Sequence, residues 1–263
     1  MDLGLKGKVA LVAGASQGLG LSVAVSLANE GARVAICSRS ADNLKAAAKT
    51  IKRNTGATVL TMVADLMDTD QARAFVQESA EQFGRVDILV TNAGGPPPGM
   101  FMSFSEDDWL KAFRLNFLSG AMMIREAVPY MKKGRWGRIV NITSISVKQP
   151  LDGLVLSNAV RSGVIGLAKT LAKELAEYNI LVNNVCPGYT MTERVRSLAA
   201  ELAARTNRTP EEIIGDWELQ VPLKRLGKPE ELADMVVFLA SERAGYITGA
   251  TIQVDGGFFK GLM

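Results

Sequence analysis

The chain has 263 residues, of which 48% are hydrophobic and 22% charged, and 30 basic against 27 acidic side chains give a net charge of +3. This length suits one α/β domain, and the composition is that of a globular protein, which excludes a disordered chain. The nearly even charge gives no argument for nucleic acid or an anionic membrane as a partner. The chain contains no histidine, which excludes Ser-His-Asp and Cys-His nucleophiles and histidine metal sites.

The cysteine count and the apolar runs predict where the protein resides. Cys37 and Cys186 are too few for a disulfide framework or a structural zinc site, so we expect a reducing, cytoplasmic environment and no metal. No stretch of about 18 apolar residues is present, so we expect no membrane-spanning helix. Lys6, Lys8 and the apolar run after them resemble a signal peptide only weakly, because that run enters a glycine-rich turn almost at once.

The first half of the chain alternates short apolar runs with segments of helical periodicity. The run from Val9 to Val12 is typical of a strand that is buried on both faces, and Gly31 and Gly84 are plausible helix stops. We predict strands at residues 9–12, 33–37, 58–63 and 86–90, and helices at residues 19–31, 41–53 and 69–83.

The second half continues the alternation after a proline-rich loop at residues 94–99. Ser105 and Asp108 resemble a capping box that opens a helix running towards Met131, and Thr209 and Pro210 are a further helix start. We predict strands at residues 138–142, 180–185 and 251–254, and helical segments at 153–178, 193–220 and 229–240. The whole pattern predicts an α/β fold, a Rossmann-type doubly wound parallel sheet in a single domain over residues 1–263.

Three glycines, Gly14, Gly18 and Gly20, lie between the first predicted strand and the first predicted helix. Glycines there permit a tight turn, and the helix N-terminus offers unpaired N–H groups to a pyrophosphate. The bland alternative is a simple strand-to-helix turn. The position after the first buried strand favours a nucleotide site.

The end of the second predicted strand bears on cofactor choice, because an acidic residue there favours NAD. The chain has Ser38 and Arg39 instead, followed by Ser40. Arg39 can pair bidentately with a 2′-phosphate, which favours NADP. The alternative is a solvated arginine beside a serine that caps the next helix.

Further motifs follow predicted strands: Asn92-Ala93-Gly94 after the fourth, Pro187-Gly188 after the sixth, and Val254-Asp255-Gly256-Gly257 near the C-terminus. With the glycine loop, they resemble the classical short-chain dehydrogenase/reductase family, including its 3-oxoacyl-acyl-carrier-protein-reductase-like members, over essentially the whole chain. Ala13 departs from the threonine usual in that family. The resemblance implies a sheet of about seven strands, NADP(H) as cofactor and a small-molecule substrate. It also implies a cofactor site made by Gly14, Ser16, Gln17, Gly18, Leu19, Gly20, Ser38, Arg39, Asp65, Leu66, Asn92, Ala93, Gly94, Arg161, Pro187, Gly188 and Thr192.

The resemblance places catalytic residues at Asn116 and Ser144, but the family's Tyr-x-x-x-Lys motif is replaced by Ser157 and Arg161. Flanking residues fit the family without a gap, so the register is secure. A serine hydroxyl is far less acidic than a phenol, and an arginine has no acceptor and cannot relay protons. Ser144 and Ser157 can still form a pair of hydrogen-bond donors for a carbonyl oxygen.

A replacement acid is one way to restore the chemistry. Tyr189 follows Pro187-Gly188 and should lie near the nicotinamide, and Lys148 and Cys186 are weaker candidates. Loop packing or solvent exposure is the alternative explanation for each of these side chains.

Residues 190–220 are expected to cover the substrate. Leu198, Leu202, Ile213, Ile214 and Trp217, with Met100, Phe101 and Met102 on the opposite wall, suggest a substrate with an apolar body, although such clusters are more often plain core. The resemblance also implies a homotetramer that pairs the helices of residues 109–131 and 153–178 across two-fold axes.

The function expected from these observations is an NADP-dependent oxidoreductase with an atypical active site. The alternative is a nucleotide-binding pseudoenzyme or regulatory subunit without hydride chemistry, which Ser157 and Arg161 favour. A dehydration or isomerisation on the same fold is a further alternative, because fold alone does not decide function.

Overall fold

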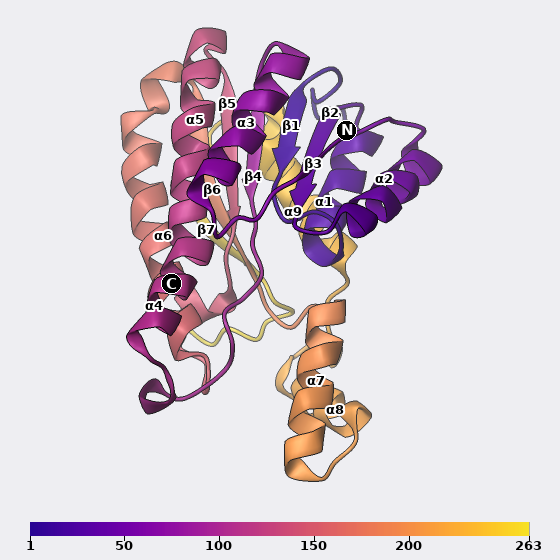
Figure 1. Cartoon of the computed structure of the whole chain (residues 1–263), viewed down its shortest axis with the longest axis vertical. Helices are drawn as coiled ribbons and strands as arrows, with labels where there is room; N and C mark the ends of the chain where they lie inside the picture. Colours follow the sequence, from indigo (N-terminus) through magenta and orange to yellow (C-terminus); the bar gives the residue numbers. More distant parts are fainter. Residues whose placement is uncertain (263) are drawn as a thin grey trace.

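Seven parallel strands form one sheet in the order β3-β2-β1-β4-β5-β6-β7 in the computed structural model, which describes residues 1–262 (Figure 1). The strand order reverses between β1 and β4, which is the switch point of a doubly wound sheet. The strands are β1 Val9–Val12, β2 Arg33–Ser38, β3 Leu60–Val63, β4 Ile88–Thr91, β5 Gly137–Ile142, β6 Ile180–Pro187 and β7 Thr251–Val254.

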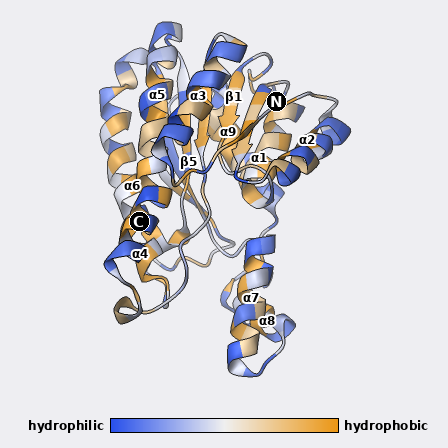
Figure 2. Ribbon diagram, in the orientation of Figure 1, coloured by the Kyte–Doolittle hydropathy of each residue, from blue (hydrophilic) through white to orange (hydrophobic). Residues whose placement is uncertain are grey.

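Helices cover both faces of this sheet. On one face α1, α2 and α9 pack over an apolar cluster, and on the other α3, α5 and α6 pack over a second cluster (Figure 1). Figure 2 shows the apolar residues gathered on the strands and polar residues on the outer helix surfaces. The helices are α1 Gly18–Asn29, α2 Ala41–Thr55, α3 Thr69–Phe83, α4 Glu106–Phe113, α5 Ser119–Gly134, α6 Val155–Glu174, α7 Glu193–Thr206, α8 Pro210–Gln220 and α9 Pro229–Ala240.

The predicted fold class is confirmed, and the apolar runs explain why. All four residues of β1 and all six of β5 are buried, as expected for strands covered on both faces. Gly56 and Gly84 end α2 and α3 in the left-handed conformation, at φ 74° and 77°, where glycine has no side-chain penalty. No helix within residues 1–262 is long and apolar enough to cross a membrane.

One predicted helical segment ends earlier than expected, and another is divided into two helices. The segment predicted at 153–178 is α6 followed by a short 3₁₀ turn at Ala176–Tyr178. The segment predicted at 193–220 is two helices, because Asn207 adopts φ 52° and closes α7. Thr209 then opens α8 with the expected capping box, in which its hydroxyl accepts a hydrogen bond from the Glu212 N–H.

A π-helical turn at Arg114–Leu118 joins α4 to α5, so the predicted long helix is continuous but locally widened. Ser105 caps α4 as predicted, through a hydrogen bond from the Asp108 N–H. Asn116 lies in the widened turn and is buried. Such turns are common at functional sites.

Helices α7 and α8 form a unit, residues 193–220, that projects beyond the carboxyl ends of the strands (Figure 1). It has its own apolar cluster, centred on Ala199, Ala203, Ile213 and Trp217. This cluster is separate from the two that flank the sheet.

Candidate active site

A cleft of about 500 Å³ opens at the carboxyl ends of the strands, around the switch point between β1 and β4. Its walls come from the segments that follow β1 through β6, including the start of α7. Cofactor and substrate sites of open parallel sheets form at this place, and the volume is in the range of small-molecule sites.

The segment after β1 is a closely packed turn. Gly14 has φ 57°, and a Cβ on it would lie 2.7 Å from the Asn92 carbonyl oxygen. A Cβ on Gly20 would lie 2.5 Å from the Gly14 carbonyl oxygen, so both positions require glycine. The Asn92 amide fixes the turn by donating to the carbonyls of Ala13 and Gly14, at 3.3 and 3.0 Å.

The N-terminus of α1 opens toward the cleft. Gln17 is its N-cap residue, and no side chain of the described chain accepts from the first-turn N–H groups there. Gln17, Gly18 and Leu19 line the cleft. Free N–H groups and the helix dipole favour an anion at this position, as a dinucleotide pyrophosphate requires.

The end of β2 forms the far end of the cleft. Ser40 caps α2 by accepting from the Asn43 N–H at 3.2 Å, and the Ser38 hydroxyl donates to the Ser40 carbonyl at 3.3 Å. Arg39 is exposed and lines the cleft. Ser40 therefore caps the next helix, as the alternative to a phosphate site predicted. Arg39 lines the cleft, as a role in binding the 2′-phosphate requires.

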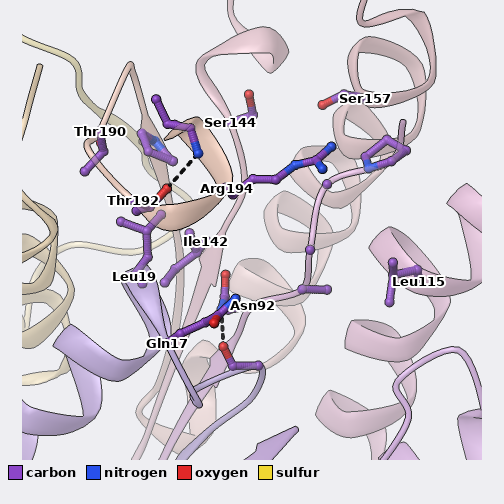
Figure 3. A pocket seen from close by; sticks show the side chains of 18 of the residues that line it. Gln17, Leu19, Asn92, Leu115, Ile142, Ser144, Ser157, Thr190, Thr192 and Arg194 are labelled. Atoms are coloured by element: carbon purple, nitrogen blue, oxygen red, sulfur yellow. Dashed lines mark hydrogen bonds between the residues drawn. The ribbon is translucent and has the colours of Figure 1, made fainter. Parts of the chain in front are cut away.

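Three serines meet at the opposite end of the cleft. The Ser144 hydroxyl accepts from the Ser146 N–H at 3.1 Å, and the hydroxyls of Ser146 and Ser157 lie 3.2 Å apart. Ser144 follows β5 and Ser157 lies in the first turn of α6, and both line the cleft (Figure 3). Two hydroxyls from different elements thus reach one region of the cleft.

Arg161 lies one helical turn after Ser157 and is held by backbone carbonyls. Its guanidinium donates to the carbonyls of Ile142, Thr143 and Ala93 at 3.4, 3.2 and 3.3 Å. Burial lowers the pKa of the Arg161 side chain to about 10, so it remains charged at neutral pH. The arrangement ties α6 to the ends of β4 and β5.

Asn116 faces a second, inner cavity of about 30 Å³. Its amide donates to the Gly94 carbonyl at 2.7 Å, while its buried Oδ1 atom has no hydrogen-bond partner within the described residues. A polar cavity of this size accommodates one water. Arg161 lines both this cavity and the main cleft.

The three candidate replacement acids occupy different surroundings. Tyr189 lines the cleft, stacked on Trp217 with ring centroids 5.2 Å apart and against the edge of Phe258, and burial raises the pKa of its phenol. Lys148 is not a cleft residue; its ammonium lies 5.4 Å from the centre of the Phe259 ring. Cys186 is buried with its sulfur 3.1 Å from the Thr143 hydroxyl, and burial raises the pKa of its thiol. Only Tyr189 among them therefore faces the cleft.

Comparison with known proteins identifies the family. The chain is 37% identical over 259 residues to the 3-oxoacyl-(acyl-carrier-protein) reductase of Aquifex aeolicus, covering 98% of this chain and 100% of that relative. The sequence profile of a family described as enoyl-(acyl carrier protein) reductase matches residues 14–259. The chain is a short-chain dehydrogenase/reductase.

Solved structures of the same family resemble this dehydrogenase/reductase closely. L-sorbose reductase from Gluconobacter frateurii, complexed with NADPH and L-sorbose, superimposes with a TM-score of 0.95 at 35% identity, and each chain is covered completely. A single-residue variant of the actinorhodin polyketide ketoreductase with NADPH gives a TM-score of 0.92 at 32% identity, covering 97% of this chain and 98% of that one.

Most of the predicted site residues of this dehydrogenase/reductase line the one cleft. They are Gly14, Ser16, Gln17, Gly18, Leu19, Ser38, Arg39, Asp65, Leu66, Asn92, Ala93, Gly94, Ser144, Ser157, Arg161, Pro187, Gly188, Tyr189 and Thr192. Gly20 and Asn116 lie behind the cleft wall, Gly20 supporting the turn and Asn116 facing the inner cavity.

The apolar residues expected at the substrate end are placed differently. Only Leu198 among them lines the cleft, whereas Leu202, Ile213, Ile214 and Trp217 pack inside the α7–α8 unit. Met100, Phe101 and Met102 are exposed, and none of them lines the cleft. Leu115, Leu151 and Leu154 supply apolar wall instead.

Sequence reasoning missed two charged residues that line the cleft, Glu193 and Arg194. Arg194 lies at the start of α7 and lines the cleft (Figure 3). Its spacing of four residues from Leu198 puts the two on one helix face, which is the signal that could have found it.

Proposed function

We propose that this chain is an NADP(H)-dependent oxidoreductase that transfers a hydride between the nicotinamide and a carbonyl or hydroxyl carbon of a small molecule. The observation that carries the proposal is that the glycine turn, Arg39 and the Ser144–Ser157 pair line one continuous cleft. Reductases of the same family with NADPH bound have the same fold at TM-scores of 0.95 and 0.92.

The residues present fit the cofactor. The uncapped N-terminus of α1 supplies N–H donors for the pyrophosphate, and Arg39 supplies a cation for the 2′-phosphate. Thr190 and Thr192 line the cleft at the nicotinamide end, after β6. When bound, the reduced nicotinamide supplies the hydride for carbonyl reduction.

Ser157 and Arg161 stand where the family has Tyr and Lys. Their surroundings support hydrogen bonding to the substrate oxygen by the serine and a positioning role for the arginine. The hydroxyls of Ser144 and Ser157 orient the substrate oxygen and donate hydrogen bonds to it as negative charge develops. Arg161 donates to three carbonyls and carries no proton that it can release at neutral pH, so it positions the strand ends and the cofactor ribose. The proton for the alkoxide comes from water or from the phenol of Tyr189, a residue that lines the same cleft.

The α7–α8 unit is the substrate-covering segment of this proposal. Its α7 contributes Glu193, Arg194, Val195 and Leu198 to the cleft, while its own apolar cluster holds the two helices together. A unit with these properties can close over a ligand as one body and exclude water from the reaction.

The assembly proposed with this function is a homotetramer. Leu110 and Phe113 on α4 are exposed at 49% and 43%, and Phe113 stacks on Phe117 of the widened turn. Apolar side chains gathered on one helix face mark an interaction surface. Light scattering tests the assembly, and a stable particle of 28.2 kDa would contradict it.

The decisive experiment follows NADPH oxidation with a panel of ketones and acyl thioesters, alongside NADPH binding measured by fluorescence titration. Oxidation with any panel member, reduced in Ser144→Ala at unchanged NADPH affinity, supports the proposed function. Tight NADPH binding without oxidation across the panel supports the alternative, a nucleotide-binding protein without hydride chemistry, which the Ser157 and Arg161 substitutions favour.

A further inference from the structure

The substrate end of the cleft contains a cation that the proposed chemistry does not use. Arg194 occupies the second position of α7, is exposed, and lines the cleft. Figure 3 shows its side chain extending from α7 towards the side of the cleft where α6 and Ser157 lie, away from Leu19 and the glycine turn.

No structural partner within the described residues explains this side chain. Arg208 in this unit pairs with Asp216, and Arg225, in the segment that follows α8, pairs with Glu231, each at 2.6 Å. By contrast, no carboxylate of residues 1–262 lies within 4.0 Å of the Arg194 guanidinium. Glu193 precedes it and also lines the cleft, without an ion pair between them.

The position of Arg194 in its helix gives a second argument. Cations near a helix N-terminus are disfavoured by the positive end of the dipole, so the residue costs stability where it stands. Thr192 caps the same helix by accepting from the Val195 N–H, so the helix start needs no arginine. A ligand anion in the cleft would offset the unfavourable placement and use the first-turn N–H groups as well.

The phosphates of the cofactor have other donors. The α1 N-terminus and Arg39 lie on the glycine-turn side of the cleft, and Figure 3 shows Arg194 directed away from that side. Leu198, one turn further along α7, lines the cleft beside it and gives the site an apolar neighbour.

We propose that Arg194 binds an anionic group, a carboxylate or a phosphate, carried by the substrate, and so selects negatively charged carbonyl compounds. This inference rests on the proposed function. Bidentate pairing with the guanidinium would anchor the charged end of the substrate, so that its carbonyl meets the hydroxyls of Ser144 and Ser157. Because Arg194 is on the α7–α8 unit, the same contact would hold that unit closed.

The test compares the wild type with Arg194→Gln, Arg194→Lys and the matched control Arg196→Gln. Arg196 is an exposed cation on the same helix, two residues further on, and does not line the cleft. The probes are acetoacetate and dihydroxyacetone phosphate, each with its uncharged counterpart, ethyl acetoacetate and dihydroxyacetone. We expect Arg194→Gln to raise KM for an anionic probe about tenfold or more, as for loss of a charge-assisted hydrogen bond, with little change for the uncharged one. Arg194→Lys should fall between, and Arg196→Gln should match the wild type.

Two readouts separate failure of this inference from failure of the proposed function. The dissociation constant of NADPH, from fluorescence titration, should be unchanged in Arg194→Gln; a rise there with unchanged selectivity among ketones would assign the charge to cofactor phosphate and overturn the inference. If the wild type oxidises no NADPH, calorimetry of both anionic probes with the NADP⁺-bound protein replaces kinetics. Binding that Arg194→Gln weakens and Arg196→Gln does not still supports the site, and no binding, or equal binding by wild type and Arg194→Gln, overturns it.

Discussion

The hydroxyl oxygens of Ser146 and Ser157 lie 3.2 Å apart, so the loop after β5 and the first turn of α6 are joined directly at the cleft. The Ser146 N–H also donates to the Ser144 hydroxyl at 3.1 Å. Ser146 therefore orients both hydroxyls that we propose to act on the substrate oxygen. None of these three serine hydroxyls is acidic enough to serve as a good general acid for the substrate oxygen.

Restoring a phenol and an ammonium should accelerate the generic reaction. In Ser157→Tyr with Arg161→Lys, we expect NADPH oxidation with a small activated ketone to rise at least about tenfold, because a positioned general acid contributes roughly 10²–10⁴-fold. Ser157→Tyr alone should do less, since a guanidinium held by three carbonyls places its charge differently from an ammonium. Steady-state rates of the three proteins with one ketone provide the measurement.

Tyr189→Phe is the companion variant. It removes the one candidate replacement acid that faces the cleft and leaves the stacking on Trp217 in place. A fast wild type in which Tyr189→Phe is harmless would contradict our account of the missing acid.

Cofactor preference should depend on Arg39. In the wild type we expect NADPH to bind more tightly than NADH, and Arg39→Asp to reverse the order, because a carboxylate repels the 2′-phosphate and accepts from a 2′-hydroxyl. Fluorescence titration of both cofactors measures this. Arg53→Asp, on the last turn of α2, changes the net charge equally and should leave the preference intact. Equal affinities in the wild type would refute the prediction.

Glycine at position 20 should be required by packing. A Cβ there would lie 2.5 Å from the Gly14 carbonyl oxygen, so Gly20→Ala must displace the turn, and we expect loss of NADPH binding with destabilisation of about 1–3 kcal/mol. Gly215→Ala, inside α8 with nothing within 4 Å of the added Cβ, should instead gain about 0.5–1 kcal/mol. Urea denaturation and fluorescence titration of both variants check this; similar effects from the two would contradict it.

Stability should fall in mildly alkaline solution because of two buried thiols. Burial raises the pKa of Cys37 to about 12 and also raises that of Cys186, whereas thiols of the unfolded chain ionise near pH 8.5–9. The unfolded state therefore loses protons first, and the free energy of unfolding drops between pH 7.5 and 9.5, by roughly 1 kcal/mol for Cys37 and further in the same direction for Cys186. Arg161, with its pKa lowered to about 10, acts in the opposite direction only at higher pH.

Urea denaturation at several pH values tests this dependence. The double variant Cys37→Ala/Cys186→Ala should show a nearly flat profile over the same interval, although its unfolding free energy at neutral pH will be lower from lost packing. An unchanged slope in the double variant would assign the effect to other groups.

The sequence predicted the sheet and the cofactor end of the site because both depend on local patterns. Fully apolar runs such as Val9–Val12 indicate buried strands, and the glycines at 14 and 18 supply the positive φ angles that the turn adopts. The substrate end depends on how separate segments meet. Periodicity alone could not tell that Trp217 packs inside the α7–α8 unit, because that packing depends on the break at Asn207. Nor could it tell that the helix face shared by Arg194 and Leu198 is turned to the cleft, because that depends on how the loop after β6 places the start of α7. The orphaned Oδ1 of Asn116 likewise arises from tertiary burial.

The separate apolar cluster of α7 and α8 has a consequence for how this scaffold diversifies. Because this cluster is separate from the two that flank the sheet, although Tyr189, Met191 and Leu226 from the flanking segments also belong to it, exchanges on the cleft-facing side of the unit need not disturb the contacts that hold the sheet together. Under the substrate-covering role that we propose for residues 193–220, substitution or replacement within this segment would change substrate choice while the nucleotide end of the cleft stays the same. The sheet and the loops after its strands would then keep the cofactor site constant, while the α7–α8 unit could vary with the substrate.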